Sequence, residues 1–170
     1  MTQVILVDSL DNEIGFQDKM EAHIEGALHR AFSIFIFNSS GQMLLHRRAL
    51  NKYHSGGQWT NACCSHPIPN KPIEDTLHER LQFEMGMNCE LQFRFTFLYK
   101  AFVEPDLQEH ELDHIYFGMT DQIPQPNPEE VAEWKYMSLD SIQNELNERP
   151  SIYTPWFKLL FPQILKNVQS

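Results

Sequence analysis

The stretch PIEDTLHERLQFEMGMNCELQFRFTFLYKAFVE, residues 72–104, changes the spacing of its apolar residues midway. In its first half they recur every four positions, at Ile73, Leu77, Leu81 and Met85. This spacing predicts a helix over 72–87 with one buried stripe, begun at Pro72 and ended at Gly86. From residue 89 to 104 apolar and polar residues alternate over much of the length, which predicts a long strand. We therefore expect a fold in which helices pack on a sheet.

The remaining segments repeat both types of element. We expect strands at 3–8, 58–63, 111–121 and 132–139, and a hairpin over 31–48 whose strands flank the turn NSSG. The strand at 111–121 is expected to run antiparallel to 89–104 across PDLQEH. Helices are expected at 18–24, at 140–150 with Asp140 as N-cap, and at 154–168 with a kink or break at Pro162. These elements predict an α+β or α/β/α layered fold, with residues 1–170 as a single domain.

Composition and charge narrow the class of protein. The 170 residues are 42% hydrophobic and 21% charged, which is typical of a globular chain. No apolar run approaches the length of a membrane span, and the N-terminal apolar patch is too short and too acidic for an export signal, so we expect a cytoplasmic protein. A net charge of −10 disfavours general binding of nucleic acid or an anionic membrane. We expect neither partner, and a monomer or weak homodimer.

The segment TNACCSHPIP, residues 60–69, contains two of the three cysteines. Neighbouring cysteines rarely form a disulfide without strain, so the thiols are expected to be free and reduced. Cys64 beside His66 fits a nucleophile and its base. A buried thiol that packs as a small apolar residue fits the spacing better.

Three further groups allow both a functional and a structural interpretation. Glu109 and Glu111 alternate on a strand, so both carboxylates point to one face, where histidines and a metal ion fit them; a solvated pair is the alternative. Trp156 fits the core or a site that stabilises a cation. The cations within residues 44–54 fit a phosphate site or a solvated face: Arg47, Arg48 and Lys52.

Several motifs in this order carry a family resemblance: RRALNKYHSGGQWTNACCSHP, FEMG, LYKA, EHELDH and TPWFK. Over about residues 3–166 the chain resembles the type I isopentenyl-diphosphate isomerases of the Nudix superfamily. The resemblance implies a Nudix-like α/β/α sandwich with a mixed sheet. It also implies an enzyme of isoprenoid biosynthesis that interconverts isopentenyl and dimethylallyl diphosphate, moving a double bond through a carbocation.

The resemblance also implies roles for individual residues. The expected metal ligands are His23, His29, His66, Glu109 and Glu111. Glu84 is expected to hold magnesium against the diphosphate. The expected catalytic residues are Cys64, Glu111, Tyr99 and Trp156. The expected cationic contacts to the diphosphate are Lys19, Arg48, Lys52 and Arg80.

Two cofactors are expected with this site. Mg²⁺ accompanies the diphosphate, and one Mn²⁺ or Zn²⁺ occupies the site of three histidines and two glutamates. The chemistry suits these groups, because a carbocation must be kept from water and an indole face stabilises it without trapping it.

Departures from the family pattern leave two alternatives. The spacing of His23 and His29 is one residue shorter than in bacterial relatives. In the Nudix box, Glu79 and Arg80 stand in reversed order and Phe83 replaces a glutamate, which argues against nucleotide hydrolysis. The alternatives are a Nudix hydrolase of a nucleotide or other organic diphosphate, and a metal-binding protein without catalysis.

Overall fold

The structure, a computed structural model, describes residues 2–169. Helix α2 (Ile73–Met85) and strand β7 (Leu91–Glu104) confirm the change of period. Leu77, Leu81 and Met85 are buried, and Gly86 ends the helix with φ of 59°. A Cβ on Gly86 would lie 2.0 Å from the carbonyl oxygen of Gln125, so no larger residue fits there without movement.

Eight further strands share one sheet with β7. They are β1 (Gln3–Val7), β2 (Glu13–Asp18), β3 (His29–Phe37), β4 (Met43–Arg48), β5 (Trp59–Thr60), β6 (Cys63–Ser65), β8 (Leu107–Met119) and β9 (Val131–Met137). The other helices are α1 (Lys19–Glu25), α3 (Leu139–Glu148), a 3₁₀ turn (Pro150–Ile152) and α4 (Pro155–Val168). None of the helices within residues 2–169 is long and apolar enough to cross a membrane.

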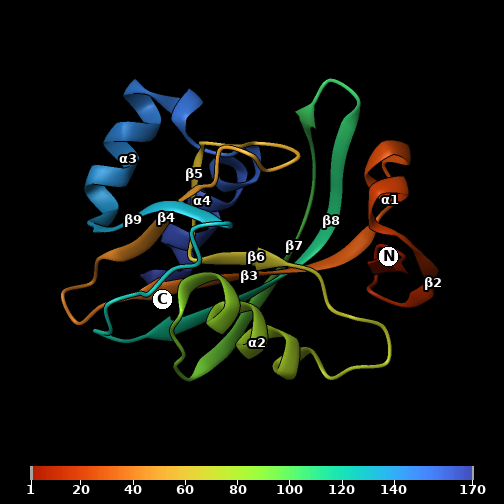
Figure 1. Ribbon diagram of the computed structural model, residues 1–170, viewed down its shortest axis with the longest axis horizontal. Coiled ribbons are helices and arrows are strands. Elements are labelled where there is room, and N and C mark those ends of the chain that lie inside the picture. Colours follow the sequence, from red (N-terminus) through yellow and green to blue (C-terminus); the bar gives the residue numbers. More distant parts are fainter. Residues whose placement is uncertain (1, 170) are drawn as a thin grey trace.

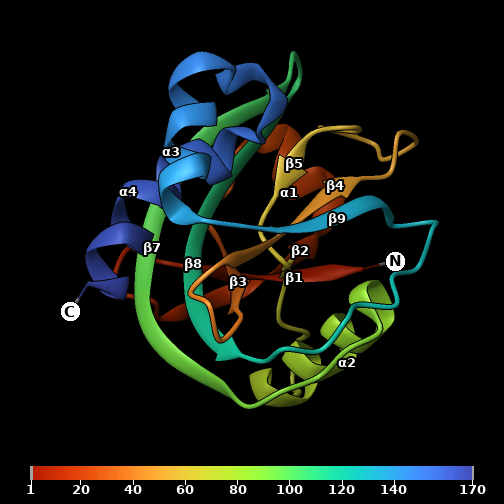
Figure 2. The same cartoon turned by 90° about the vertical axis from the view of Figure 1, so that its left-hand side faces the viewer.

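Strand β3 lies at the centre of the sheet. It runs parallel to β8 from the pair His29 and Glu111 to the pair Phe37 and Met119. Its other neighbours, β1, β4 and β6, are antiparallel, so the sheet is mixed. Strand β8 turns back on β7 in a long hairpin that curls around the molecule (Figure 2).

Both faces of β3 are buried, because helices cover the sheet on two sides. Ile34 and Ile36 belong to the core that contains α2, whereas Phe35 and Phe37 belong to the core that contains α3 and α4. Figure 1 shows α2 on one side of the sheet and α3 and α4 on the other. This arrangement confirms the expected α+β, layered α/β/α architecture with a mixed sheet.

Three strand predictions need correction. The expected hairpin over 31–48 has its turn at NSSG, but its strands pair only at Phe37 and Met43 and then diverge to β8 and β9. The strand expected at 58–63 is two short strands, β5 and β6, which pair with β4 and β3. Strand β8 begins at Leu107, four residues before the prediction, because Glu109 and His110 pair with β7 instead of forming a loop.

Strand β2 and two helix details were also missed or mistaken. Residues 13–18 form β2, whose side chains are mostly exposed or half-buried and therefore leave little apolar pattern. Helix α3 is capped by Ser138, whose side chain accepts the Ser141 N–H, and not by Asp140. Helix α4 has no break at Pro162, which lies on its exposed face, where water can bond the carbonyl freed by the proline; the alternative of a kink stays a prediction.

Candidate functional site

Register in the sheet sets side chains of distant segments beside one another. Glu111 of β8 lies opposite His29 of β3 on one side and Tyr99 of β7 on the other. Cys64 of β6 lies opposite Ser33 of β3, and His66 follows directly after β6. Helix α1, capped by the Asp18 side chain and ended at Gly26, brings His23 to the same place.

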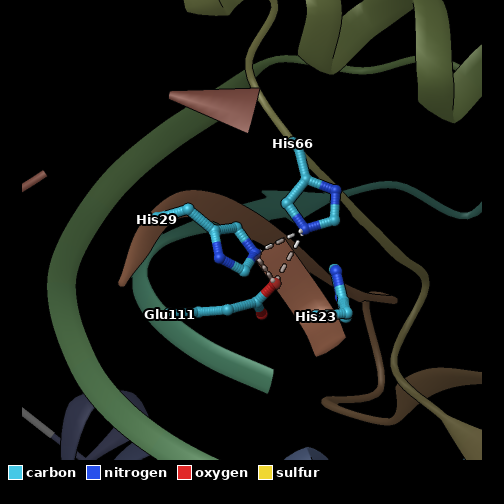
Figure 3. A group of neighbouring side chains, drawn as sticks. All are labelled: His23, His29, His66 and Glu111. Atoms are coloured by element: carbon cyan, nitrogen blue, oxygen red, sulfur yellow. Dashed lines mark hydrogen bonds and ion pairs between the residues drawn. The ribbon is translucent and has the colours of Figure 1, made fainter. Parts of the chain in front are cut away.

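Three of these side chains converge on one point. Glu111 Oε2 lies 2.7 Å from His66 Nε2 and 3.0 Å from His29 Nε2, and the two nitrogens are 3.3 Å apart. Figure 3 shows the imidazoles of His23, His29 and His66 and the Glu111 carboxylate gathered from separate segments. Ligand atoms on a first-row divalent ion lie about 3 Å apart when the bonds are about 2.1 Å, so this spacing suits a metal site.

Backbone carbonyls define the tautomers of two histidines. The Nδ1–H of His23 donates to the Lys19 carbonyl at 2.7 Å, and that of His29 donates to the Ala27 carbonyl at 2.9 Å. Each Nε2 therefore presents a lone pair when the ring is neutral. In the part of the chain that the structure describes, buried His23 Nε2 has no hydrogen-bond partner. Lone pairs this close repel unless protons or a cation lie between them, so these residues fit a divalent metal ion.

Glu109 lies beside this cluster. Its Oε1 is 3.5 Å from His54 Nε2 and 4.0 Å from His23 Nε2, and its Oε2 accepts from the Tyr99 hydroxyl at 2.7 Å. The same hydroxyl lies 2.5 Å from Glu111 Oε1. One phenolic hydrogen serves one carboxylate at a time, so the second carboxylate needs a proton or a cation.

The two carboxyl groups have opposite pKa shifts. Burial, and next the charge of Glu111, raises the pKa of Glu109 well above its usual value. Burial also opposes the charge of Glu111, but the hydrogen bonds from His29 and His66 outweigh it and lower the pKa of Glu111. The pair can therefore hold one proton between two sites, as an acid and base centre requires.

Cys64 faces the cavity with its thiol held in place. Its Sγ lies 3.1 Å from Asn61 Oδ1 and 3.6 Å from Ser33 Oγ. The Asn61 amide donates to the carbonyls of Ile34 and Cys63 at 2.8 and 3.1 Å, so its oxygen must face the sulfur. Burial raises the pKa of Cys64 to about 12, so the thiol keeps its proton at neutral pH. Cys63 is buried in the core beside α2.

One cavity connects most of the expected site residues. It is lined, among others, by Cys64, His66, Tyr99, Glu109, Glu111, Trp156, Glu84, Lys19, Arg48, Lys52 and Arg80. His23 and His29 are fully buried and reach the site through the histidine and glutamate cluster. All the residues expected from the resemblance are thus brought together, although they come from α1, α2, α4, five strands and the loops that follow β4 and β6.

The four cations of the cavity already have partners. Lys52 Nζ lies 2.5 Å from Glu130 Oε2, and Arg80 binds Glu84 Oε2 through two nitrogens at 3.1 and 2.9 Å. Lys19 Nζ lies 5.0 Å from the centre of the Tyr53 ring. This mixture of charges suits an anion that arrives with a divalent cation, because the cation offsets the two carboxylates.

Arg48 and Trp156 both line the cavity and lie against each other. The Arg48 guanidinium lies 5.2 Å from the indole centre and donates to the His54 carbonyl at 3.2 Å. Trp156, in the first turn of α4, is 2% exposed and packs in the core, so it is both a core residue and a cavity residue. Arg47, the neighbour of Arg48, points away and pairs with Glu133 at 3.1 Å.

Sequence reasoning missed several residues of the site. They are Tyr53, His54, Glu130, Ser33, Asn61 and Asp113. Alternation along β8 could have indicated Asp113, because it shares a face with Glu109 and Glu111. Tyr53, His54 and Glu130 lie on turns whose path no local pattern reveals.

The comparisons with known proteins agree with this architecture. Residues 27–157 match the model of the NUDIX domain family. A crystal structure from Deinococcus radiodurans superposes with a TM-score of 0.79 at 13% identity, covering 95% of this chain and 98% of that one. A MutT protein from Methanosarcina mazei has a TM-score of 0.68 at 16% identity, covering 84% and 96%. These two structures show the fold.

Curated relatives are similar over nearly the whole chain. The isopentenyl-diphosphate Delta-isomerase of Pectobacterium atrosepticum is 48% identical over 164 residues, covering 96% of this chain and 92% of the relative. The isopentenyl-diphosphate Delta-isomerase 2 of Aromatoleum aromaticum is 47% identical over 163 residues, covering 96% and 86%. Both relatives thus match nearly the whole of this chain.

Proposed function

Because the chain belongs to the Nudix family and, within it, to the isopentenyl-diphosphate Delta-isomerases, we propose that it interconverts isopentenyl and dimethylallyl diphosphate. The observation that carries this is that the Cys64 thiol and the Glu111–Tyr99 pair line one cavity. The isomerase is favoured over a Nudix hydrolase, since the box glutamate expected at position 83 is a phenylalanine.

The reaction needs two proton-transfer groups. One proton is added to the terminal carbon of the double bond, which leaves a tertiary carbocation, and one proton is removed from the neighbouring methylene. We assign these roles to Cys64 and to Glu111 assisted by Tyr99. Each group gives a proton in one direction of the reaction and takes it in the other, so the protons balance.

The cavity protects the intermediate. Trp156 is almost fully buried, and its indole face offers no nucleophile to a cation. The indole already lies against the Arg48 guanidinium, and the same face can stabilise a carbocation. Exclusion of water then prevents formation of an alcohol.

We propose two metal sites for this activity. His23, His29, His66, Glu109 and Glu111 would hold Mn²⁺ or Zn²⁺, and Glu84 would hold Mg²⁺ together with the diphosphate. A divalent ion at the first site supplies positive charge that keeps Glu111 oriented and tunes its affinity for a proton. Lys19, Arg48, Lys52 and Arg80 bind the diphosphate, whose binding energy positions the five-carbon tail.

The substrate, the domain organisation and the cellular location of the enzyme follow from this chemistry. The substrate is a small allylic or homoallylic diphosphate, and residues 1–170 act as one unit because residues 19 to 156 line one cavity. The free thiol of Cys64 suits a reducing compartment, so we propose a cytoplasmic protein. We propose a monomer or weak homodimer without nucleic acid or membrane partners.

The test is incubation with isopentenyl diphosphate and Mg²⁺ in deuterated water. We expect deuterium-labelled dimethylallyl diphosphate from the wild type, and a loss of at least about 100-fold in kcat for Cys64→Ala because a proton-transfer group is gone. Cys89→Ala is the matched control, since Cys89 does not line the cavity. Release of phosphate, with Cys64→Ala fully active, would show a hydrolase instead.

A further inference from the structure

We propose that His54 supplies a sixth ligand, through Nε2, to the divalent ion held by the three histidines and two glutamates. The inference rests on the metal site of the proposed function and adds a residue to it. His54 lies in the loop between β4 and β5 and is 3% exposed. The site would then consist of four imidazoles and two carboxylates.

The candidate ligand atoms form two triangles, and His23, which belongs to the second, also lies close to every member of the first. In the first, Glu111 Oε2, His29 Nε2 and His66 Nε2 are separated by 2.7, 3.0 and 3.3 Å. In the second, Glu109 Oε1 lies 3.5 Å from His54 Nε2 and 4.0 Å from His23 Nε2. All atoms of the second triangle lie within 4.8 Å of one another, and His23 Nε2 is as close to every atom of the first.

Two opposite triangular faces make an octahedron. With bonds of about 2.1 Å, neighbouring ligands of an octahedral ion lie about 3.0 Å apart and opposite ligands about 4.2 Å apart. The first triangle already has the spacing of neighbours. The second triangle is wider, with Glu109 Oε1 at 3.5 Å from His54 Nε2 and 4.0 Å from His23 Nε2. The atoms of the two triangles do not all lie within 4.8 Å of one another, so His54 and Glu109 have to move toward the first triangle when the ion binds.

The surroundings of His54 leave its Nε2 available. Its Nδ1 lies 3.2 Å from Ser55 Oγ, which can accept the Nδ1–H, in the same way as carbonyls accept from His23 and His29. The 3.5 Å from Nε2 to Glu109 Oε1 is too long for a good hydrogen bond. A ligating histidine commonly donates its other N–H to a nearby oxygen.

Neighbouring groups also hold the ring in this orientation. Arg48 donates to the His54 carbonyl at 3.2 Å. Tyr53 and Trp156 pack edge-on, with ring centres 4.3 and 5.7 Å from the imidazole. Little rotamer freedom is therefore left to lose when His54 binds an ion.

A sixth protein ligand changes the role of the ion. A site filled by six side chains has no place for water or substrate, so the ion orients Glu111 and does not bind the diphosphate. Six ligands also favour an ion that prefers octahedral geometry, such as Mn²⁺, over Zn²⁺, which is mostly four-coordinate in closed sites.

Counting the bound imidazoles tests the proposal. The full chain is loaded with Co²⁺, and hyperfine-shifted proton NMR signals of imidazole N–H groups that vanish in deuterated water are counted. We expect four signals from the wild type and three from His54→Ala. Chelator competition is expected to show at least about tenfold weaker Co²⁺ binding by the variant. His78→Ala, on α2 and bonded to Asn88, is the control and should keep four signals.

The outcomes separate this inference from the proposed function. Three signals from the wild type would overturn the role of His54 and leave the five-residue site intact. This count needs no variant, so it decides the question even if His54→Ala does not fold. A chain that binds no Co²⁺ at all would overturn the metal site in both forms.

Discussion

At the scale of single residues, the site depends on groups whose hydrogen bonds allow one arrangement. Asn61 must turn its oxygen to Cys64, because its amide nitrogen is held by two carbonyls. Tyr99 lies between Glu109 and Glu111 and can donate to one of them. Such contacts determine which atom holds a proton, and so they are the place to test the chemistry.

Tyr99→Phe removes the hydroxyl shared by the two glutamates and keeps the buried ring. We expect kcat to fall by about 10- to 100-fold, because Glu111 loses the partner that orients its carboxylate and stabilises its charge. KM should change little, since Tyr99 is on the wall near the metal cluster and makes no pair with the four cations. Steady-state kinetics measures both constants.

Tyr153→Phe is the control for this change. Tyr153 is also buried, and its hydroxyl donates to Glu145 at 2.7 Å, but it does not line the cavity. Both variants lose one hydroxyl–carboxylate bond and should lose about 1 to 3 kcal/mol of stability. An equal decrease of kcat in both variants would contradict the role given to Tyr99.

At the scale of elements, the ends of helices and strands decide where the site residues lie. Helix α2 carries Arg80 and Glu84 in its last turns, and Gly86 ends it against residue Gln125. Helix α1 has only seven residues, and the Asp18 cap and Gly26 at its ends hold His23 in position.

Gly86→Ala is expected to destabilise the protein by clearly more than about 1 kcal/mol. The residue has φ of 59°, and its Cβ would meet the Gln125 carbonyl at 2.0 Å. Gly41→Ala is the matched control, because φ there is 76° and no atom lies within 4 Å of its Cβ. Denaturant unfolding measures the free energy of each variant. Equal losses would mean that the contact with Gln125 adds nothing to the backbone strain.

At the scale of the whole molecule, the curled sheet brings the histidine and glutamate cluster together from α1, β3, β8 and the loop after β6. Most of these groups are buried, and several carboxylates and lone pairs face one another. The cluster is therefore a place where a divalent ion can join segments that would otherwise repel.

Removal of the ion is expected to lower the midpoint of thermal unfolding and to loosen α1 first. Helix α1 is short, and Nε2 of its buried His23 has no hydrogen-bond partner among residues 2–169. Hydrogen exchange of the chelated protein should therefore show lost protection in α1 and around His66, while α2 stays protected. An equal loss of protection in all elements, or no loss of protection in α1, would contradict the link between the ion and the stability of α1.

Local patterns predicted the elements well because period and capping act over a few residues. The stripe of α2 and the alternation of β7 are properties of neighbouring side chains, and the structure has both. Strand β2 and the pairing partners of β3 and β4 were not predictable in this way, because β2 has little buried surface and pairing depends on distant strands.

The sequence by itself determined the helices and the long strands, and the order of its motifs carried the family resemblance, with expected roles for residues such as Cys64 and Glu111. Only the tertiary structure decided which atoms meet. His54 belongs to the site because the loop after β4 brings it to the cluster, whereas Arg47 is held outside the site by Glu133 and the Gly57 carbonyl. The physical reason is range: periodicity is local, whereas a site assembled from residues 19 to 156 exists only when the sheet has closed.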